Sequence, residues 1–230
     1  MLLKKIILEG DSKYEKENKL FPIRWKSHHV TELFIELCPE IELDGNRQLT
    51  ILATRKRREN SKKYNNYKAF HASSYYLEEE QIKTLELLES EEAEKYILNI
   101  IEEVLIDITD MFDKTAEKNN IIKDTVKEMV EKDFSLKKKI NTLSKKAKGG
   151  KYKAEVFRCL NKNSGEAWCV EIQCGSSAQT SRVEWLTNKP DYLDRRDYFK
   201  KSRWEENKFI ITNKLGVEVV TIDVDTYELN

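Results

Sequence analysis

Hydrophobic side chains between Glu78 and Asp113 recur at the spacing of an amphipathic helix. They follow one another at steps of three and four residues, the period that lines one face of a helix with about 3.6 residues per turn. The positions concerned are Tyr96, Ile97, Ile100, Ile101, Val104, Leu105, Ile108, Met111 and Phe112. Ser90 can cap such a helix, and the acids that follow it suit the positive end of the helix dipole. We therefore expect two helices, over residues 78–89 and 91–112.

The chain before this helical block has the patterns of β-strands. Four stretches are apolar or alternate between apolar and polar side chains, at residues 2–9, 31–38, 48–55 and 67–73. The turn pair Asp44-Gly45 separates the second of these stretches from the third. These features predict an N-terminal antiparallel sheet.

A further helical region is predicted over residues 119–147, and Gly149-Gly150 marks its end. The charged and aromatic stretch 191–207 is also expected to be helical. Strand patterns return at residues 153–161, 166–175, 183–186, 208–212 and 217–224.

The fold class that follows is α+β, with an N-terminal antiparallel sheet, a central helical block and a C-terminal β-rich segment with one helix. We expect two lobes. Residues 1–147 would form an N-terminal α+β lobe that carries the acidic helical block. Residues 151–230 would form a C-terminal lobe of β-hairpins and one helix.

Composition supports a folded protein outside the membrane. Aromatic residues make up 10% of the chain, more than disordered segments carry. No apolar run approaches the roughly 20 residues that span a bilayer, and the start of the chain lacks the apolar core of a secretory signal. Four cysteines are too few for a disulfide framework, and their spacing fits no common zinc site. We expect a cytoplasmic protein with no membrane partner, no metal and no cofactor.

Acidic and basic residues are concentrated in separate segments, although the chain as a whole is neutral. Lys+Arg and Asp+Glu both number 41, so the net charge favours no class of partner. Residues 78–113, however, hold thirteen acids and two lysines. Residues 45–70 hold eight basic residues and one acid, and residues 114–153 hold thirteen lysines and five acids. The three segments could pair internally, or the acidic one could face a basic partner.

The leading hypothesis is a non-catalytic cytoplasmic protein that binds and neutralises a partner protein with a basic surface. Toxin-immunity proteins and phage anti-defence proteins, from bacteria or phages, are of this type. The expected partner-binding residues are the acids on the outer face of the helical block, namely Glu91, Glu94, Glu102, Glu103, Asp107 and Asp110. The simpler alternative is that these acids only solvate the outside of a core helix.

An enzymatic alternative rests on Glu171, Ile172 and Gln173. On the expected strand, Glu171 and Gln173 share one face, and Glu155 is an acid upstream. The element resembles the acid-x-lysine element of PD-(D/E)xK nucleases, over about 20 residues, with Gln173 in place of the lysine. The resemblance implies a divalent metal bound by Glu155 and Glu171. The alternative is an ordinary strand with a polar outer face.

A third hypothesis is a nucleic-acid-binding protein. The run Arg55, Lys56, Arg57 and Arg58 lies close to two tyrosines, Tyr64 and Tyr67. Basic side chains could bind phosphates while the aromatic rings stack on bases. The competing interpretation is an exposed and solvated connection between strands.

Overall fold

The computed structural model describes residues 1–56, 61–112, 116–174 and 181–225. The chain forms two compact units, Met1–Ser135 and Leu136–Asn230. The α+β class is confirmed, with an N-terminal sheet, a helical block and a C-terminal β-rich region. The division between the units comes earlier than Gly149-Gly150, which lies within the second unit.

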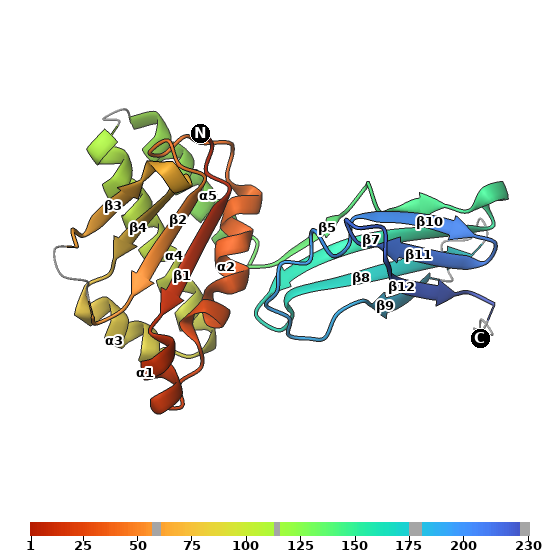
Figure 1. Cartoon of the computed structure of the whole chain (residues 1–230), viewed down its shortest axis with the longest axis horizontal. Coiled ribbons are helices and arrows are strands. Elements are labelled where there is room, and N and C mark those ends of the chain that lie inside the picture. Colours follow the sequence, from red (N-terminus) through yellow and green to blue (C-terminus); the bar gives the residue numbers. More distant parts are fainter. Residues whose placement is uncertain (57–60, 113–115, 175–180, 226–230) are drawn as a thin grey trace. The chain divides into compact units, whose positions relative to one another are not determined.

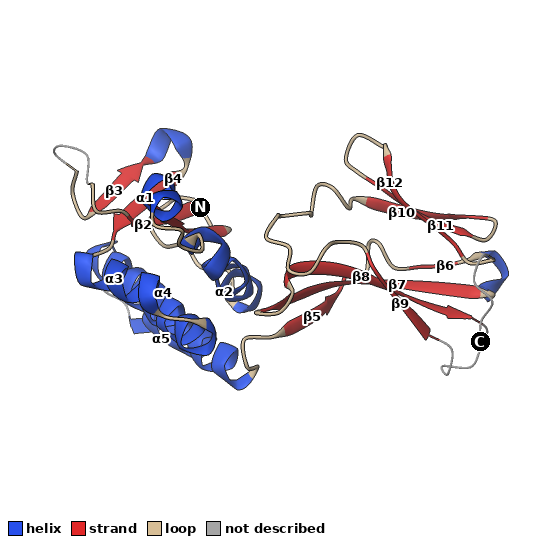
Figure 2. Cartoon of the chain, turned by 90° about the horizontal axis from the view of Figure 1, so that it is seen from below, coloured by secondary structure: helices blue, strands red, loops and turns tan. Residues whose placement is uncertain are grey.

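The first unit is a mostly parallel sheet with helices on one face (Figures 1 and 2). Its elements in chain order are β1 (Lys5–Gly10), α1 (Ser12–Glu17), α2 (Ile23–Leu37), β2 (Gln48–Ala53), β3 (Tyr64–Tyr67), η1 (Lys68–Phe70), β4 (Ala72–Tyr76), α3 (Glu79–Leu87), α4 (Ser90–Phe112) and α5 (Ala116–Glu131). The strand order is β1-β2-β4-β3. The expectation of an antiparallel sheet is wrong for β1, β2 and β4, which run parallel, and holds only for β3 against β4.

The stretch 31–38, expected to be a strand, belongs instead to helix α2. Its apparent alternation is a short window of a helical pattern, because Ile23, Val30, Leu33 and Phe34 are all buried and follow helical steps. A helix here also supplies the crossover that two parallel neighbours, β1 and β2, require. The period of two was therefore misleading over so few residues.

The core of the first unit lies between the sheet and the helices α2, α4 and α5. Ile6 and Leu8 of β1 stand in register with Leu49 and Ile51 of β2, and all four are buried. Helix α4 contributes most of the apolar stripe that the sequence predicts. Ile97, Ile100, Ile101, Val104, Leu105 and Ile108 are buried, as is Leu98, whereas the predicted members Met111 and Phe112 are exposed near the end of the helix. Burying each such side chain contributes about 1.5–3 kcal/mol to stability.

The expected helix over 119–147 ends early. Helix α5 stops at Glu131, and the backbone then takes positive φ angles of 48° at Asp133 and 50° at Phe134. Residues other than glycine rarely adopt this backbone conformation, and it ends a right-handed helix. The lysine-rich continuation forms strands of the second unit, so the helical prediction is wrong from residue 132 onward.

The second unit is a sandwich of two antiparallel sheets, shown as two layers in Figure 2. Its elements are β5 (Leu136–Lys139), β6 (Lys145–Lys146), η2 (Lys148–Gly150), β7 (Tyr152–Asn161), β8 (Gly165–Cys174), β9 (Ser181–Trp185), β10 (Lys201–Glu205), β11 (Lys208–Thr212) and β12 (Glu218–Asp223). The larger sheet has the order β5-β7-β8-β9, with β6 also pairing with β7. The smaller sheet has the order β10-β11-β12.

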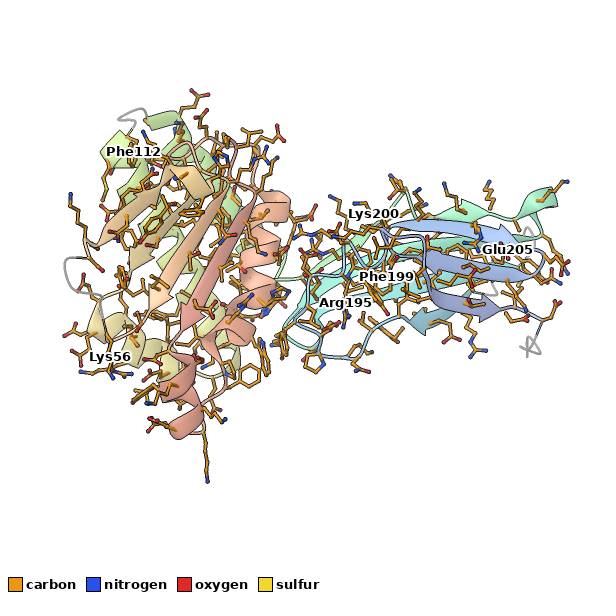
Figure 3. The ribbon with its side chains drawn as sticks, viewed as in Figure 1. Lys56, Phe112, Arg195, Phe199, Lys200 and Glu205 are labelled. Atoms are coloured by element: carbon orange, nitrogen blue, oxygen red, sulfur yellow. The ribbon has the colours of Figure 1, made fainter. Side chains whose placement is uncertain are left out.

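Aromatic rings fill the space between the two sheets. The ring centroids of Trp168 and Phe199 are 5.3 Å apart, and both side chains are buried. Phe199 is labelled in Figure 3. Phe209 and Ile211 of the smaller sheet belong to the same core. The prediction of a helix over residues 191–207 is wrong. Residues 201–205 form strand β10, and the backbone around Phe199 is irregular.

Candidate acidic binding site

Helix α4 carries the acids that the sequence singles out, but they do not share one environment. Glu103 and Asp110 are exposed, and Glu102 and Asp107 are half-buried. Glu94 is buried, so the expectation that it lies on the outer face is wrong. The side chain of Glu91 lies outside the described residues.

Glu94 is held by a residue of helix α2. Its Oε1 atom lies 2.6 Å from Nε2 of His29, and both side chains are buried. The sequence contains a signal for this burial, since Glu94 precedes Ile97 and Leu98 by three and four residues and therefore lies in line with the apolar stripe. We assign Glu94 to the packing of α4 on α2.

Two of the other acids, Glu103 and Asp107, line a pocket of about 450 Å³ in the first unit. The pocket lies where the end of β4, the start of α3 and the middle of α4 come together. Its walls are made by Lys63, Tyr75, Glu78, Glu80, Gln81, Glu103, Val104 and Asp107. Four carboxylates therefore face one ammonium group, which makes the pocket a site for positive charge.

Asp107, on the α4 side of this pocket, is held by Tyr75 and Lys63. The Tyr75 hydroxyl donates a hydrogen bond to Oδ2 of Asp107, and Nζ of Lys63 lies 3.5 Å from the same oxygen. Burial, together with the Asp107 carboxylate, raises the pKa of Tyr75 to about 12. The hydrogen bond with Tyr75 raises the pKa of Lys63. At neutral pH the phenol is thus neutral and the amine charged, so neither is prepared to act as a base or a nucleophile.

Gln81 joins the two helices that form the walls. Its Oε1 accepts the backbone N–H of Glu78 at 3.0 Å, within the capping box that begins α3. Its Nε2 donates to Oε2 of Glu103 at 3.2 Å. These bonds hold the start of α3 against α4 before any ligand arrives. Glu80, on the same wall, is exposed.

The basic run at 55–58 is only partly available to a ligand. The Nη1 and Nη2 atoms of Arg55 each lie 2.8 Å from a carboxylate oxygen of Glu86, and its guanidinium lies 4.2 Å from the centre of the Tyr14 ring. Lys56 is exposed at the surface of the first unit (Figure 3). Arg57 and Arg58 lie outside the described residues. Arg55 therefore forms an ion pair within the first unit with Glu86, one acid of the helical block.

The residues of the nuclease hypothesis come together on the outer face of the larger sheet. Glu155 stands directly opposite Glu171 on β7 and β8, and Gln173 stands opposite Lys153. Both carboxylates form ion pairs with lysines. Lys139 and Lys153 pair with Glu155, and Nζ of Lys137 lies 2.5 Å from Oε1 of Glu171.

These lysines hold the pKa of Glu155 below its usual range. In the part of the chain that the structure describes, no group of three potential metal ligands is found. The acids and lysines form a ladder of charges across neighbouring strands, of the kind that stabilises a sheet.

The acidic pocket is one of the hollows in the described part of the first unit, and its chemistry suits a cation with hydrogen-bond donors. No helix within the described ranges is both long and apolar enough to cross a membrane. Comparisons with family models, curated proteins and solved structures return no match for this chain.

Proposed function

We propose that this protein binds a partner protein with a basic surface through the acidic pocket of its first unit, and thereby inhibits or neutralises that partner in the cytoplasm. Toxin-immunity and phage anti-defence proteins act in this way. The observation that carries the proposal is the pocket of about 450 Å³ in which four carboxylates face one ammonium. An arginine side chain of the partner is the ligand that matches it best.

Arginine fits because the pocket offers several carboxylates from different elements. A guanidinium is planar and carries five N–H donors, so it can bind two carboxylates at once. Glu103 and Glu80 offer carboxylate oxygens from two helices, whereas Tyr75 is buried and its ring has the ammonium of Lys63 over it, 5.1 Å from the ring centre. A pocket of this size also lies in the range of about 300–1,000 Å³ that is usual for ligand sites.

The other acids of α4, half-buried Glu102 and exposed Asp110, would speed the approach of a basic partner. Glu102 and Asp110 lie on the same helix as Glu103 and Asp107. Carboxylates gathered on one surface raise the association rate with a positively charged protein, and this effect weakens as salt screens it. When this chain covers the basic residues of the partner, those residues can no longer contact their usual anionic ligand. Binding would therefore inhibit the partner.

The proposal is tested by capturing the partner next to the pocket. A photo-reactive residue in place of Asn99, which is exposed one turn before Glu103 on α4, should cross-link a basic protein, and that protein's activity should fall when purified wild-type chain is added. The charge-reversal set Glu102→Lys, Glu103→Lys, Asp107→Lys and Asp110→Lys should abolish both effects while circular dichroism stays unchanged. Unchanged affinity in this folded variant would sink the proposal.

A further inference from the structure

We propose that two copies of this chain associate through the free edge of β9, the side on which no described strand pairs with it, with the two β9 strands antiparallel about Val183. The inference concerns the second unit alone. It is independent of the acidic pocket in the first unit.

The two edges of the larger sheet differ in how they are protected. One edge is formed by β5 and β6, which are short, interrupted and lysine-rich. Five exposed lysines lie there, at Lys137, Lys138, Lys139, Lys145 and Lys146. Lysines on a short edge strand discourage pairing with another chain.

The other edge is β9, which within the described ranges pairs only with β8. The strand itself contains no lysine and leaves Val183 46% and Trp185 41% exposed, with Nζ of Lys189 3.7 Å from the centre of the Trp185 ring. Its two charged residues, Arg182 and Glu184, have opposite signs and can pair between two antiparallel copies, so this edge opposes a second strand less than the lysine-rich edge does.

The hydrogen-bond pattern shows which backbone groups of β9 face outward. The N–H of Leu186 donates to the carbonyl of Trp168 at 2.8 Å, just beyond the register pair of Trp185 with Cys169. Bonding alternates along an antiparallel pair, so Glu184 and Arg182 turn their N–H and C=O groups toward β8. The N–H and C=O of Val183 therefore point to the free edge, where a second strand would bond to them.

The sequence of β9 is complementary to itself in one register. When two copies pair antiparallel with Val183 opposite Val183, Arg182 of each copy faces Glu184 of the other. In the single chain the same two side chains form an ion pair along the strand, with Nε of Arg182 2.5 Å from Oε1 of Glu184. Centring the pair on Arg182 or on Glu184 would instead oppose like charges. Charge thus selects the register about Val183.

This register is isologous, as a two-fold dimer requires. It extends the larger sheet from one copy into the next and brings the Val183 side chains together on its outer face. Because only five residues of each copy form the new ladder, we expect a dimer that dissociates on dilution.

Sedimentation equilibrium of the full chain at increasing concentration tests the inference. The wild type should approach twice the mass of one chain, and Val183→Pro should associate at least about tenfold more weakly. Proline removes the outward N–H of Val183 but none of the bonds to β8, so the fold should persist. Wild type that stays a single chain at every concentration, or Val183→Pro that associates as the wild type does, overturns the inference.

A charge exchange supplies a second test with a built-in control. Arg182→Glu places like charges opposite each other and should give single chains, whereas the double variant Arg182→Glu with Glu184→Arg should restore the dimer. Val183→Cys should also be linked between copies by a short bismaleimide, while Leu215→Cys, 80% exposed in the turn after β11, should not. A double variant that remains dissociated although folded would contradict the pairing, as would equal cross-linking from both cysteines.

Discussion

The Nε2 atom of His29 lies 2.6 Å from the Oε1 atom of Glu94, and this contact joins the buried sides of helices α2 and α4. Replacing Glu94 by alanine leaves a buried imidazole without that partner and opens a small cavity. We expect Glu94→Ala to lower the free energy of unfolding by about 1–3 kcal/mol, measured by urea denaturation. Glu92→Ala, an exposed acid on the same helix, should change it by less than about 0.5 kcal/mol. Equal effects of the two substitutions would show that Glu94 does not hold the helices together.

Among the described residues that line the acidic pocket, Lys63 carries the positive charge, and it competes with any cationic ligand. Lys63→Gln removes this charge while Tyr75 still donates to Asp107. We expect the variant to bind an arginine-rich peptide about two- to fivefold more tightly than the wild type, a gain typical of one partly screened charge. Fluorescence titration measures this directly. Weaker binding by Lys63→Gln would mean that the ligand is not a cation.

The charge ladder on the second unit predicts a stability that depends on pH. Lys139 and Lys153 hold the pKa of Glu155 below its usual value, so its carboxylate is stabilised more in the folded than in the unfolded chain. That stabilisation is complete above the unfolded pKa of about 4.3 and is lost as the pH falls through the folded pKa.

Glu155→Gln should therefore be less stable than the wild type by about 1 kcal/mol or less near pH 7. The difference should shrink toward zero in acid, as followed by thermal melting across a pH series. A difference that stays constant over the acid range would rule out the lysine pairing as its cause.

A nuclease assay distinguishes the nuclease hypothesis from the protein-binding hypothesis. Glu155 and Glu171 are each paired with lysine, so we expect no Mg²⁺- or Mn²⁺-dependent cleavage of DNA or RNA by the purified chain. Gel analysis of digests checks this. Cleavage that disappears in Glu171→Ala would reverse the order of the hypotheses.

Long, strongly periodic elements could be predicted from the sequence, and short or topological features could not. The buried stripe of α4 repeats from Ile97 to Ile108 over more than three turns, so the helix and most of its buried face were predictable, although Met111 and Phe112 at its end are exposed. In α2 the stretch 31–38 fits a period of two as well as a helix, and only the more distant Ile23 and Val30 decide between them. Alternation also does not encode the direction of a neighbouring strand, which is why the parallel pairing of β1, β2 and β4 was missed.

The residues of the acidic pocket were also only partly predictable from the sequence. Glu103 and Asp107 were identified from their place on an acidic helix, and they do line it. Lys63, Tyr75 and Glu80 were not, because they come from separate elements and only the tertiary fold brings them together. Glu94 was misplaced because acidic character was given more weight than its register with Ile97 and Leu98.

The most direct test of the acidic pocket is calorimetric titration of the full chain with a hexa-arginine peptide at low salt. The pocket variant Glu80→Gln with Glu103→Gln should bind about tenfold more weakly than the wild type, a loss of about 1.4 kcal/mol. The control variant Glu92→Gln with Glu117→Gln removes the same charge from exposed positions outside the pocket lining and should change affinity by less than about twofold. Equal losses in the two variants would contradict the account, since the peptide would then sense net charge alone.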